Sequence, residues 1–142
     1  GGVAWLSAND FAAIDLLWSR WSPGWAADPK RIAAVKHTFR QPGTATAAVA
    51  YYRQMLPNPV IGLGEYARIF RTLVGGAPSC PTLILAGHKD GCIGRELYKN
   101  LETSFKAPCT VTIVPEAGHF LHLERPAWVH AAILKHLVTS SQ

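Results

Sequence analysis

The chain has 142 residues, of which 49% are hydrophobic and 16% charged, with a net charge of +5. This length suits one globular domain, and the composition is too apolar for an intrinsically disordered protein. No apolar run approaches the roughly 20 residues of a membrane-spanning helix, and the opening residues resemble neither a secretory signal nor a natural start, so we expect a cut piece. Because the basic residues are interleaved with apolar ones, we predict no nucleic-acid partner.

Three cysteines are present, at positions 80, 92 and 109, and their spacing does not match a metal site. We therefore predict free thiols in a reducing compartment, the cytoplasm, and neither a metal nor a cofactor. Cys92 lies close to Asp90 in the sequence and is a conceivable nucleophile. Since its local sequence offers it no base, we favour a small packing residue.

The first half of the chain has a helical pattern up to residues 75–78. Apolar residues recur at helical spacing, and Pro and Gly separate the segments. The first expected helix begins after Asn9 or Asp10 and ends near residue 22, and the second begins after Asp28 and ends near residue 42. The third begins at Thr44 or Thr46 and ends near residue 57. A weaker fourth segment runs from Glu65 to about residue 73. Short helices rich in Trp and Tyr suit a lid over an apolar pocket better than they suit a sheet.

After Pro81 the pattern changes to two short apolar runs, at residues 82–86 and 110–114. They flank a segment of helical pattern over 94–105, and a last helix is expected over 126–137, with Pro126 near its first turn. Continuous apolar strands that alternate with helices indicate the edge of a parallel sheet covered by helices.

Asp90 follows the first expected strand, and His119 follows the second. Taken singly, Asp90 fits an Asx turn and His119 a structural histidine. Taken together, they lie at the strand ends where open α/β sheets place their ligands. A carboxylate there can hold one imidazole nitrogen and leave the other as a general base. Upstream of Asp90 the sequence contains no Gly-x-Ser-x-Gly elbow and no Asp- or Cys-centred equivalent.

Two motifs carry a resemblance to a known family. The segment 81–91 reads Pro-Thr-Leu-Ile-Leu-Ala-Gly-x-x-Asp-Gly, and 114–126 reads Val-Pro-Glu-Ala-Gly-His-Phe-x-x-x-Glu-x-Pro. They resemble the strands and loops that carry the triad acid and histidine of α/β-hydrolases. Segments 35–43 and 50–53 resemble the helical cap of the branch that contains epoxide hydrolases and haloalkane dehalogenases.

The resemblance implies an α/β fold in two parts. Residues 77–142 would be the C-terminal part of an α/β-hydrolase core, namely its last two parallel strands with flanking helices. Residues 1–76 would be a helical cap above a small apolar substrate. The N-terminal core, which carries the nucleophile, would be absent from this sequence.

The resemblance also implies roles for three residues. Asp90 would be the triad acid, and His119 the base that activates a water to hydrolyse an ester bond between enzyme and substrate. Tyr52 matches a cap tyrosine that donates a hydrogen bond to the epoxide oxygen in epoxide hydrolases, where it would stabilise alkoxide charge. The alternative for Tyr52 is that Tyr51 and Tyr52 only pack the third helix.

Three functions remain open on the sequence. The first is an epoxide hydrolase-like enzyme with an Asp nucleophile, and the second is a serine esterase with the same lid. The third is a catalytically silent fragment or subunit that binds a complementary chain. Two parallel strands would leave an open sheet edge, so we expect the chain to need its missing core, a partner chain or self-association. Alone, it should turn over no substrate.

Overall fold

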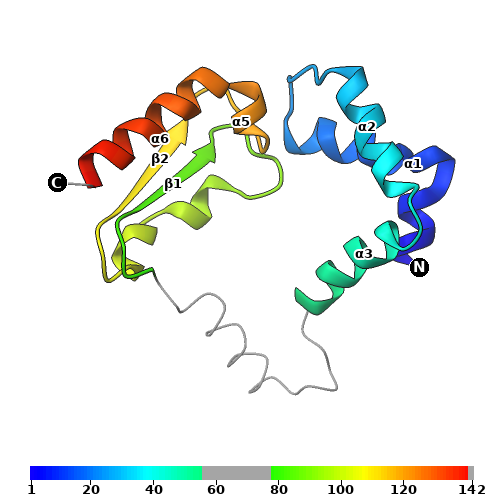
Figure 1. The fold of residues 1–142 in the computed structure, drawn as a ribbon, viewed down its shortest axis with the longest axis horizontal. Coiled ribbons are helices and arrows are strands. Elements are labelled where there is room, and N and C mark those ends of the chain that lie inside the picture. The colour runs from blue at the N-terminus through cyan, green and yellow to red at the C-terminus, as the bar shows by residue number, and fades with distance from the viewer. Residues whose placement is uncertain (56–77, 141–142) are drawn as a thin grey trace. The chain divides into compact units, whose positions relative to one another are not determined.

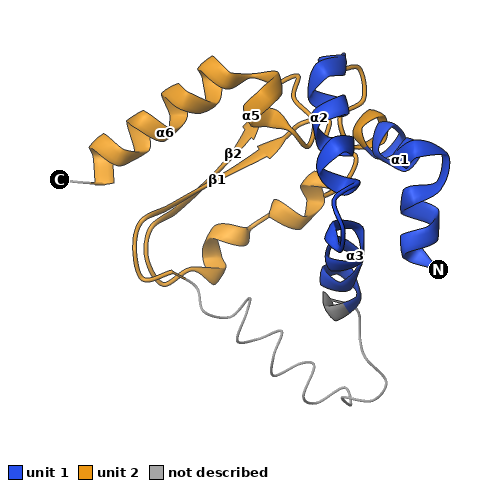
Figure 2. Ribbon diagram, turned by 45° about the vertical axis from the view of Figure 1, so that its right-hand side comes forward, with its two compact units in different colours: residues 1–17, 26–76 blue, residues 18–25, 77–142 orange. Residues whose placement is uncertain are grey.

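The structure is a computed structural model that describes residues 1–55 and 78–140, and it has mixed α/β character (Figure 1). The chain divides into two compact units (Figure 2). The first unit contains residues 1–17 and 26–76, and the second contains residues 18–25 and 77–142. From the sequence we expected residues 1–76 to form the cap, whereas the short segment 18–25 groups with the C-terminal residues in the structure.

The N-terminal helix is interrupted at the point where the sequence predicted its beginning. Helix α1 spans Gly2–Trp21, with non-helical backbone angles at Ala8–Phe11. Asn9 and Asp10 have φ angles of 48° and 54°, in the left-handed region that Asn and Asp tolerate better than most residues. The chain is therefore helical on both sides of Ala8–Phe11, whereas we had expected a helix on one side alone.

Helices α2 (Pro29–Phe39) and α3 (Thr44–Met55) confirm their sequence predictions. The Asp28 side chain caps α2, since its Oδ1 accepts a hydrogen bond from the Lys30 amide at 2.9 Å. Gly43, with a φ of 81°, occupies the turn before α3, in a conformation that favours glycine. The weaker helix predicted over 65–73 lies outside the described residues.

The second unit contains a two-stranded parallel sheet. Strands β1 (Thr82–Gly87) and β2 (Cys109–Val114) pair in register from Thr82 with Cys109 to Gly87 with Val114. Both strands confirm the sequence prediction within a residue or two at each end. Helices α5 (Leu121–Glu124) and α6 (Pro126–Ser140) follow β2, and the longer one confirms the predicted last helix.

The predicted helix over 94–105 is wrong. The segment forms two short 3₁₀ turns, η1 (Arg95–Tyr98) and η2 (Leu101–Ser104). Asn100 lies between them with a φ of 60°, in the left-handed region, which no α-helix can continue through. Each turn lies against one strand of the sheet, η1 against β1 and η2 against β2.

Buried residues of the second unit gather at the carboxyl ends of the two strands. Both strands are half-exposed over most of their length and become buried at Ala86 and Val114. Ala117, Val129 and the hydroxyl-bearing Ser22 are buried as well. The best-packed part of this unit therefore lies around the loops that follow β1 and β2, which carry Asp90 and His119.

Candidate active site

Asp90 and His119 meet at one edge of the sheet. Because β1 and β2 are parallel and in register, the loops that follow them leave the sheet on the same side. His119 Nδ1 lies 3.0 Å from Asp90 Oδ2 and 3.2 Å from Oδ1. The Asp90 side chain is 5% exposed and that of His119 is 27% exposed. A shielded carboxylate thus faces a partly accessible imidazole.

Asp90 serves its own turn as well as the histidine. Its Oδ1 accepts hydrogen bonds from the amides of Cys92 at 2.7 Å and Ile93 at 2.9 Å. The Asx turn and the acid–histidine pair, which were alternatives in the sequence, are therefore both present. Because a carboxylate can only accept, Nδ1 of His119 donates to it, and Nε2 then carries the lone pair that can take a proton.

A single backbone carbonyl joins the two loops. The oxygen of Trp21 accepts a hydrogen bond from the Gly91 amide at 3.0 Å and another from the His119 amide at 3.0 Å. Trp21 belongs to the segment 18–25, which groups with the C-terminal residues. The acid loop and the histidine loop are therefore bonded to the same point of a third segment.

Ser22 and Glu124 extend this connection. Ser22 Oγ donates to Glu124 Oε1 at 2.7 Å and accepts from the Phe120 amide at 3.2 Å. Glu124 Oε2 accepts from the Gly118 amide at 2.9 Å. From the sequence we expected Ser22 to end a helix and Glu124 or Arg125 to begin the last one, and we expected neither Ser22 nor Glu124 at the site, although Glu124 lies at a fixed position of the histidine motif. The position of Glu124 in that motif could have indicated its place at the site. No pattern in the sequence indicates a place there for Ser22.

Aromatic rings surround the imidazole. The Trp21 and Phe120 rings both lie edge-on to His119, with centroids 5.2 Å and 5.3 Å away. Trp18 contacts Phe120 at 4.4 Å and stacks on Trp25 at 5.8 Å. All four aromatic residues are half-buried. Such surroundings suit an apolar ligand beside the base.

Cys92 lies beside Asp90, but its chemistry does not suit a nucleophile. Burial raises the pKa of the Cys92 thiol, and the negative charge of Asp90 raises this pKa further. Reactive cysteines instead have lowered pKa values that favour the thiolate. Burial and the Asp90 charge also raise the pKa of Tyr98, whose phenol therefore stays neutral at ordinary pH. Cys92 is exposed, so the packing role expected from the sequence stays a prediction.

Tyr52 belongs to the first unit, on α3. Its residue is 59% exposed, and its ring lies edge-to-face on that of Tyr51 with centroids 5.6 Å apart. Asp90 and His119 belong to the second unit. The role of Tyr52 at an epoxide oxygen therefore stays a prediction.

No protein-family model matches the chain, and a search of curated proteins found no match either. Within residues 1–55 and 78–140, no group of three or more His, Cys, Asp or Glu side chains is placed to hold a metal ion. No helix in the same ranges is long and apolar enough to cross a bilayer.

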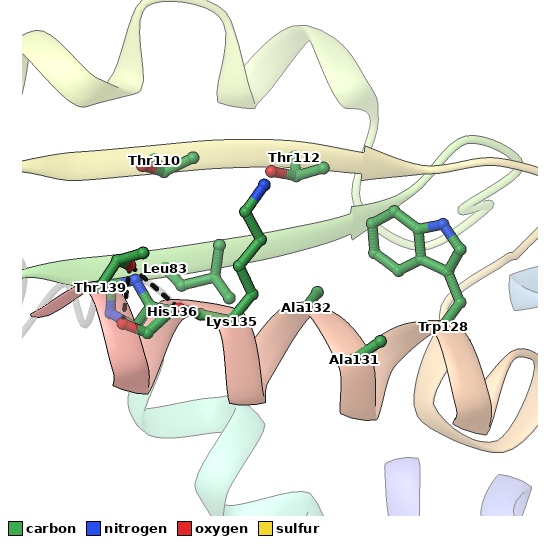
Figure 3. A pocket seen from close by; sticks show the side chains of 9 residues that line it. All are labelled: Leu83, Thr110, Thr112, Trp128, Ala131, Ala132, Lys135, His136 and Thr139. Carbon is green, nitrogen blue, oxygen red and sulfur yellow. Dashed lines mark hydrogen bonds between the residues drawn. The ribbon is translucent and has the colours of Figure 1, made fainter.

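One groove of the second unit is lined by neither Asp90 nor His119. It encloses about 380 Å³ between α6 and one face of the sheet (Figure 3). Figure 3 shows Lys135 reaching from α6 toward β2, where Thr110 and Thr112 face it. The groove is lined by Leu83, Thr110, Thr112, Trp128, Ala131, Ala132, Lys135, His136 and Thr139. It is a gap between helix and sheet whose lining includes Lys135 and His136 but no carboxylate.

A smaller pocket of about 300 Å³ lies closer to the histidine loop. It is lined by Pro23, Gly24, Trp25, Lys89, Glu116, Glu124 and Arg125. Lys89 pairs with Glu116 there, and this hydrogen bond lowers the pKa of the Glu116 carboxyl. The charged side chains that line this pocket are thus two acidic and two basic ones.

Proposed function

We propose that this chain is the cap and C-terminal part of an α/β-hydrolase of the epoxide hydrolase-like branch, with Asp90 as acid and His119 as base. The observation that supports this most is the 3.0 Å contact between His119 Nδ1 and Asp90 Oδ2 at the carboxyl ends of two parallel strands. It is the arrangement in which a carboxylate orients an imidazole and stabilises it once protonated.

In this proposal the reaction takes two steps. A nucleophilic carboxylate forms a bond to one carbon of an epoxide, and that carbon's bond to the ring oxygen breaks. Tyr52 donates a hydrogen bond to the resulting alkoxide. His119 Nε2 then takes a proton from a water as the water oxygen attacks the carbonyl carbon of the ester. The bond between that carbon and the substrate oxygen breaks, and the leaving oxygen takes the proton back from His119. The new carboxyl group loses the second proton of the water, which ends on the alkoxide of the first step, so the net result is the addition of one water to the epoxide to give a diol.

The nucleophile in this proposal comes from outside these 142 residues. The upstream sequence holds no elbow motif, and the raised pKa of Cys92 argues against that thiol. The substrate is small and apolar, in keeping with the half-buried aromatic rings around His119. We place the protein in the cytoplasm, because Cys80, Cys92 and Cys109 are all free thiols.

The alternative enzyme is a serine esterase that uses the same Asp90–His119 pair. The two chemistries differ in when the base acts. A carboxylate nucleophile is already ionised, so it needs the base only for hydrolysis of the covalent intermediate. A serine hydroxyl must lose its proton to the base before it can form that intermediate.

This difference defines the experiment. A polypeptide that joins these residues to the proposed nucleophile is mixed with an aryl epoxide or a p-nitrophenyl ester, and its intact mass is followed. In His119→Ala, the epoxide hydrolase-like mechanism predicts a stable covalent adduct with the epoxide and no turnover. The esterase mechanism predicts loss of turnover without an adduct from either substrate. Full turnover by His119→Ala would refute both mechanisms.

One observation favours the third function, a subunit that binds a complementary chain. The described sheet has two strands, and isolated sheets of this size are marginal in water. Helix α6 also exposes apolar side chains, among them Leu134 at 63% and Val138 at 64%. Sedimentation velocity across a range of concentrations tests this need for a partner. We expect concentration-dependent association, and a well-folded monomer at every concentration would show that no partner is needed.

A further inference from the structure

We propose that Ser22 and Glu124 are positioning residues that hold His119 against Asp90, acting with the Trp21 carbonyl; we call these three residues the positioning cluster. This proposal deepens the proposed function, on which its catalytic meaning rests. The sequence motifs assign the acid and the base, but they do not explain what keeps two separate loops in contact. The hydrogen bonds of the positioning cluster supply that explanation.

The first step concerns the backbone of the histidine loop. Three consecutive amides, those of Gly118, His119 and Phe120, each donate to a member of the positioning cluster. Their acceptors are Glu124 Oε2 at 2.9 Å, the Trp21 carbonyl at 3.0 Å and Ser22 Oγ at 3.2 Å. With three successive peptide groups tied in this way, the backbone that carries the imidazole has little freedom to rotate.

The second step concerns the acid loop. The Trp21 carbonyl that holds the His119 amide also holds the Gly91 amide, at 3.0 Å. Gly91 is the residue after Asp90. The Trp21 oxygen therefore binds the backbone of His119 directly and the backbone of the acid loop at the residue next to Asp90. A shift of Trp21 would move both loops, and loss of either bond would let one loop move without the other.

The third step is steric. A Cβ atom on Gly118 would lie 2.5 Å from Ser22 Cα, and one on Gly91 would lie 2.0 Å from the Arg20 carbonyl oxygen. Both distances are too short for any side chain. The segment that contains Ser22 therefore packs directly against the backbone of both loops, and these two glycines make that approach possible.

The fourth step is energetic. Ser22 is 1% exposed, and its hydroxyl donates to a carboxylate at 2.7 Å, a charge-assisted bond. Without this hydroxyl, the Phe120 amide would lose its acceptor and Glu124 Oε1 its donor. Unpaired groups of this kind are costly enough to make the loop rearrange. We infer that the rearrangement takes His119 Nδ1 away from Asp90.

The test reads the imidazole directly, without turnover. In ¹⁵N-labelled protein, two-bond ¹H–¹⁵N correlation spectra distinguish the Nδ1–H tautomer from the Nε2–H tautomer. The His119 signals are identified by their loss in His119→Ala. We expect wild-type His119 to be held in the Nδ1–H tautomer by Asp90. In Ser22→Ala and Glu124→Ala we expect loss of this single tautomer and a mixture in its place.

Two variants separate positioning from simple stability. Glu124→Gln can still accept from the Gly118 amide while its own amide donates to Ser22 Oγ, so we expect it to keep the Nδ1–H tautomer. Ser7→Ala is the matched control, because the Ser7 hydroxyl donates within α1, to the Val3 carbonyl at 3.0 Å. Far-UV circular dichroism and thermal melting report whether each variant remains folded.

The contrary outcomes are equally definite. Retention of the single Nδ1–H tautomer in folded Ser22→Ala and Glu124→Ala would overturn the proposal, even if both variants melted earlier. If Ser22→Ala does not fold, Glu124→Ala decides alone, since Glu124 is only half-buried. The result is independent of hydrolase activity, because loss of the tautomer would support positioning whether or not His119→Ala abolishes turnover.

Discussion

His119 Nδ1 lies 3.0 Å from Asp90 Oδ2, although 29 positions of the chain separate the two residues. The distance is short because β1 and β2 are parallel and in register, so that both following loops emerge at the same edge. The Asp90 carboxylate is also held by two amides of its own turn. The pair is thus positioned by the register of the sheet and by the turn that follows β1, and an acid–base site needs such fixed geometry.

Gly118→Ala should destabilise the second unit. The new Cβ would meet backbone and side-chain atoms of Ser22 that cannot move without disturbing the histidine loop. Overpacking of this kind costs about 1–3 kcal/mol in the free energy of unfolding. Gly94→Ala is the matched control, because its Cβ would meet only the flexible end of Glu96, and its cost should stay within about 0.5 kcal/mol. Urea unfolding measures both, and equal effects would contradict the close packing at Gly118.

Asp90→Asn should make Cys92 more reactive. The charge of Asp90 contributes to the raised pKa of the Cys92 thiol, so a neutral amide should lower that pKa and increase the thiolate fraction at neutral pH. Iodoacetamide labelling at fixed pH, followed by peptide mass spectrometry, should therefore show faster alkylation of Cys92. Cys109 is the internal control, because its pKa is raised by burial and by Glu102 instead. An unchanged or slower rate at Cys92 would count against the electrostatic contact.

Tyr52→Phe should slow the opening of an epoxide ring if the phenol donates to the developing alkoxide. The substitution should lower the rate at which the covalent intermediate forms. Intact-mass measurements on a polypeptide that also contains the nucleophile report this rate. Loss of one such donor costs about 10²–10³ in rate. Tyr51→Phe, which removes the neighbouring hydroxyl of the same ring pair, should have little effect. Equal rates for both variants would mean that Tyr52 only packs against Tyr51.

The sequence was sufficient for features that depend on local chemistry. Asp28 and Pro29 predicted the beginning of α2, and the two apolar runs predicted β1 and β2, because capping and strand patterns act within a few residues. The segment 94–105 was predicted wrongly, since its apolar spacing suits a helix while Asn100 adopts a left-handed conformation. One left-handed residue is enough to end a helix, and the periodicity of the apolar residues around it does not report its backbone angles.

The candidate site was predictable only in part, for a similar reason. Asp90 and His119 follow strands and could be paired by assuming a parallel sheet. The contacts of Trp21 and Ser22 with the histidine loop join residues about 100 positions apart, as the separation of 102 between Ser22 and Glu124 illustrates. Neither residue carries a local pattern that reveals such a partner. Long-range hydrogen bonds between loops require the three-dimensional structure.

The most direct test of the Asp90–His119 assignment is the kcat of Asp90→Asn with an aryl epoxide, in a polypeptide that joins these residues to the proposed nucleophile. An amide cannot stabilise the protonated imidazole as the carboxylate does, so we expect kcat to fall by about 10²–10⁴-fold. Asp15→Asn, which alters an exposed carboxylate paired with Lys36, should keep the wild-type rate. A kcat for Asp90→Asn close to that of the wild type would contradict the assignment of Asp90 and His119 as an acid–base pair.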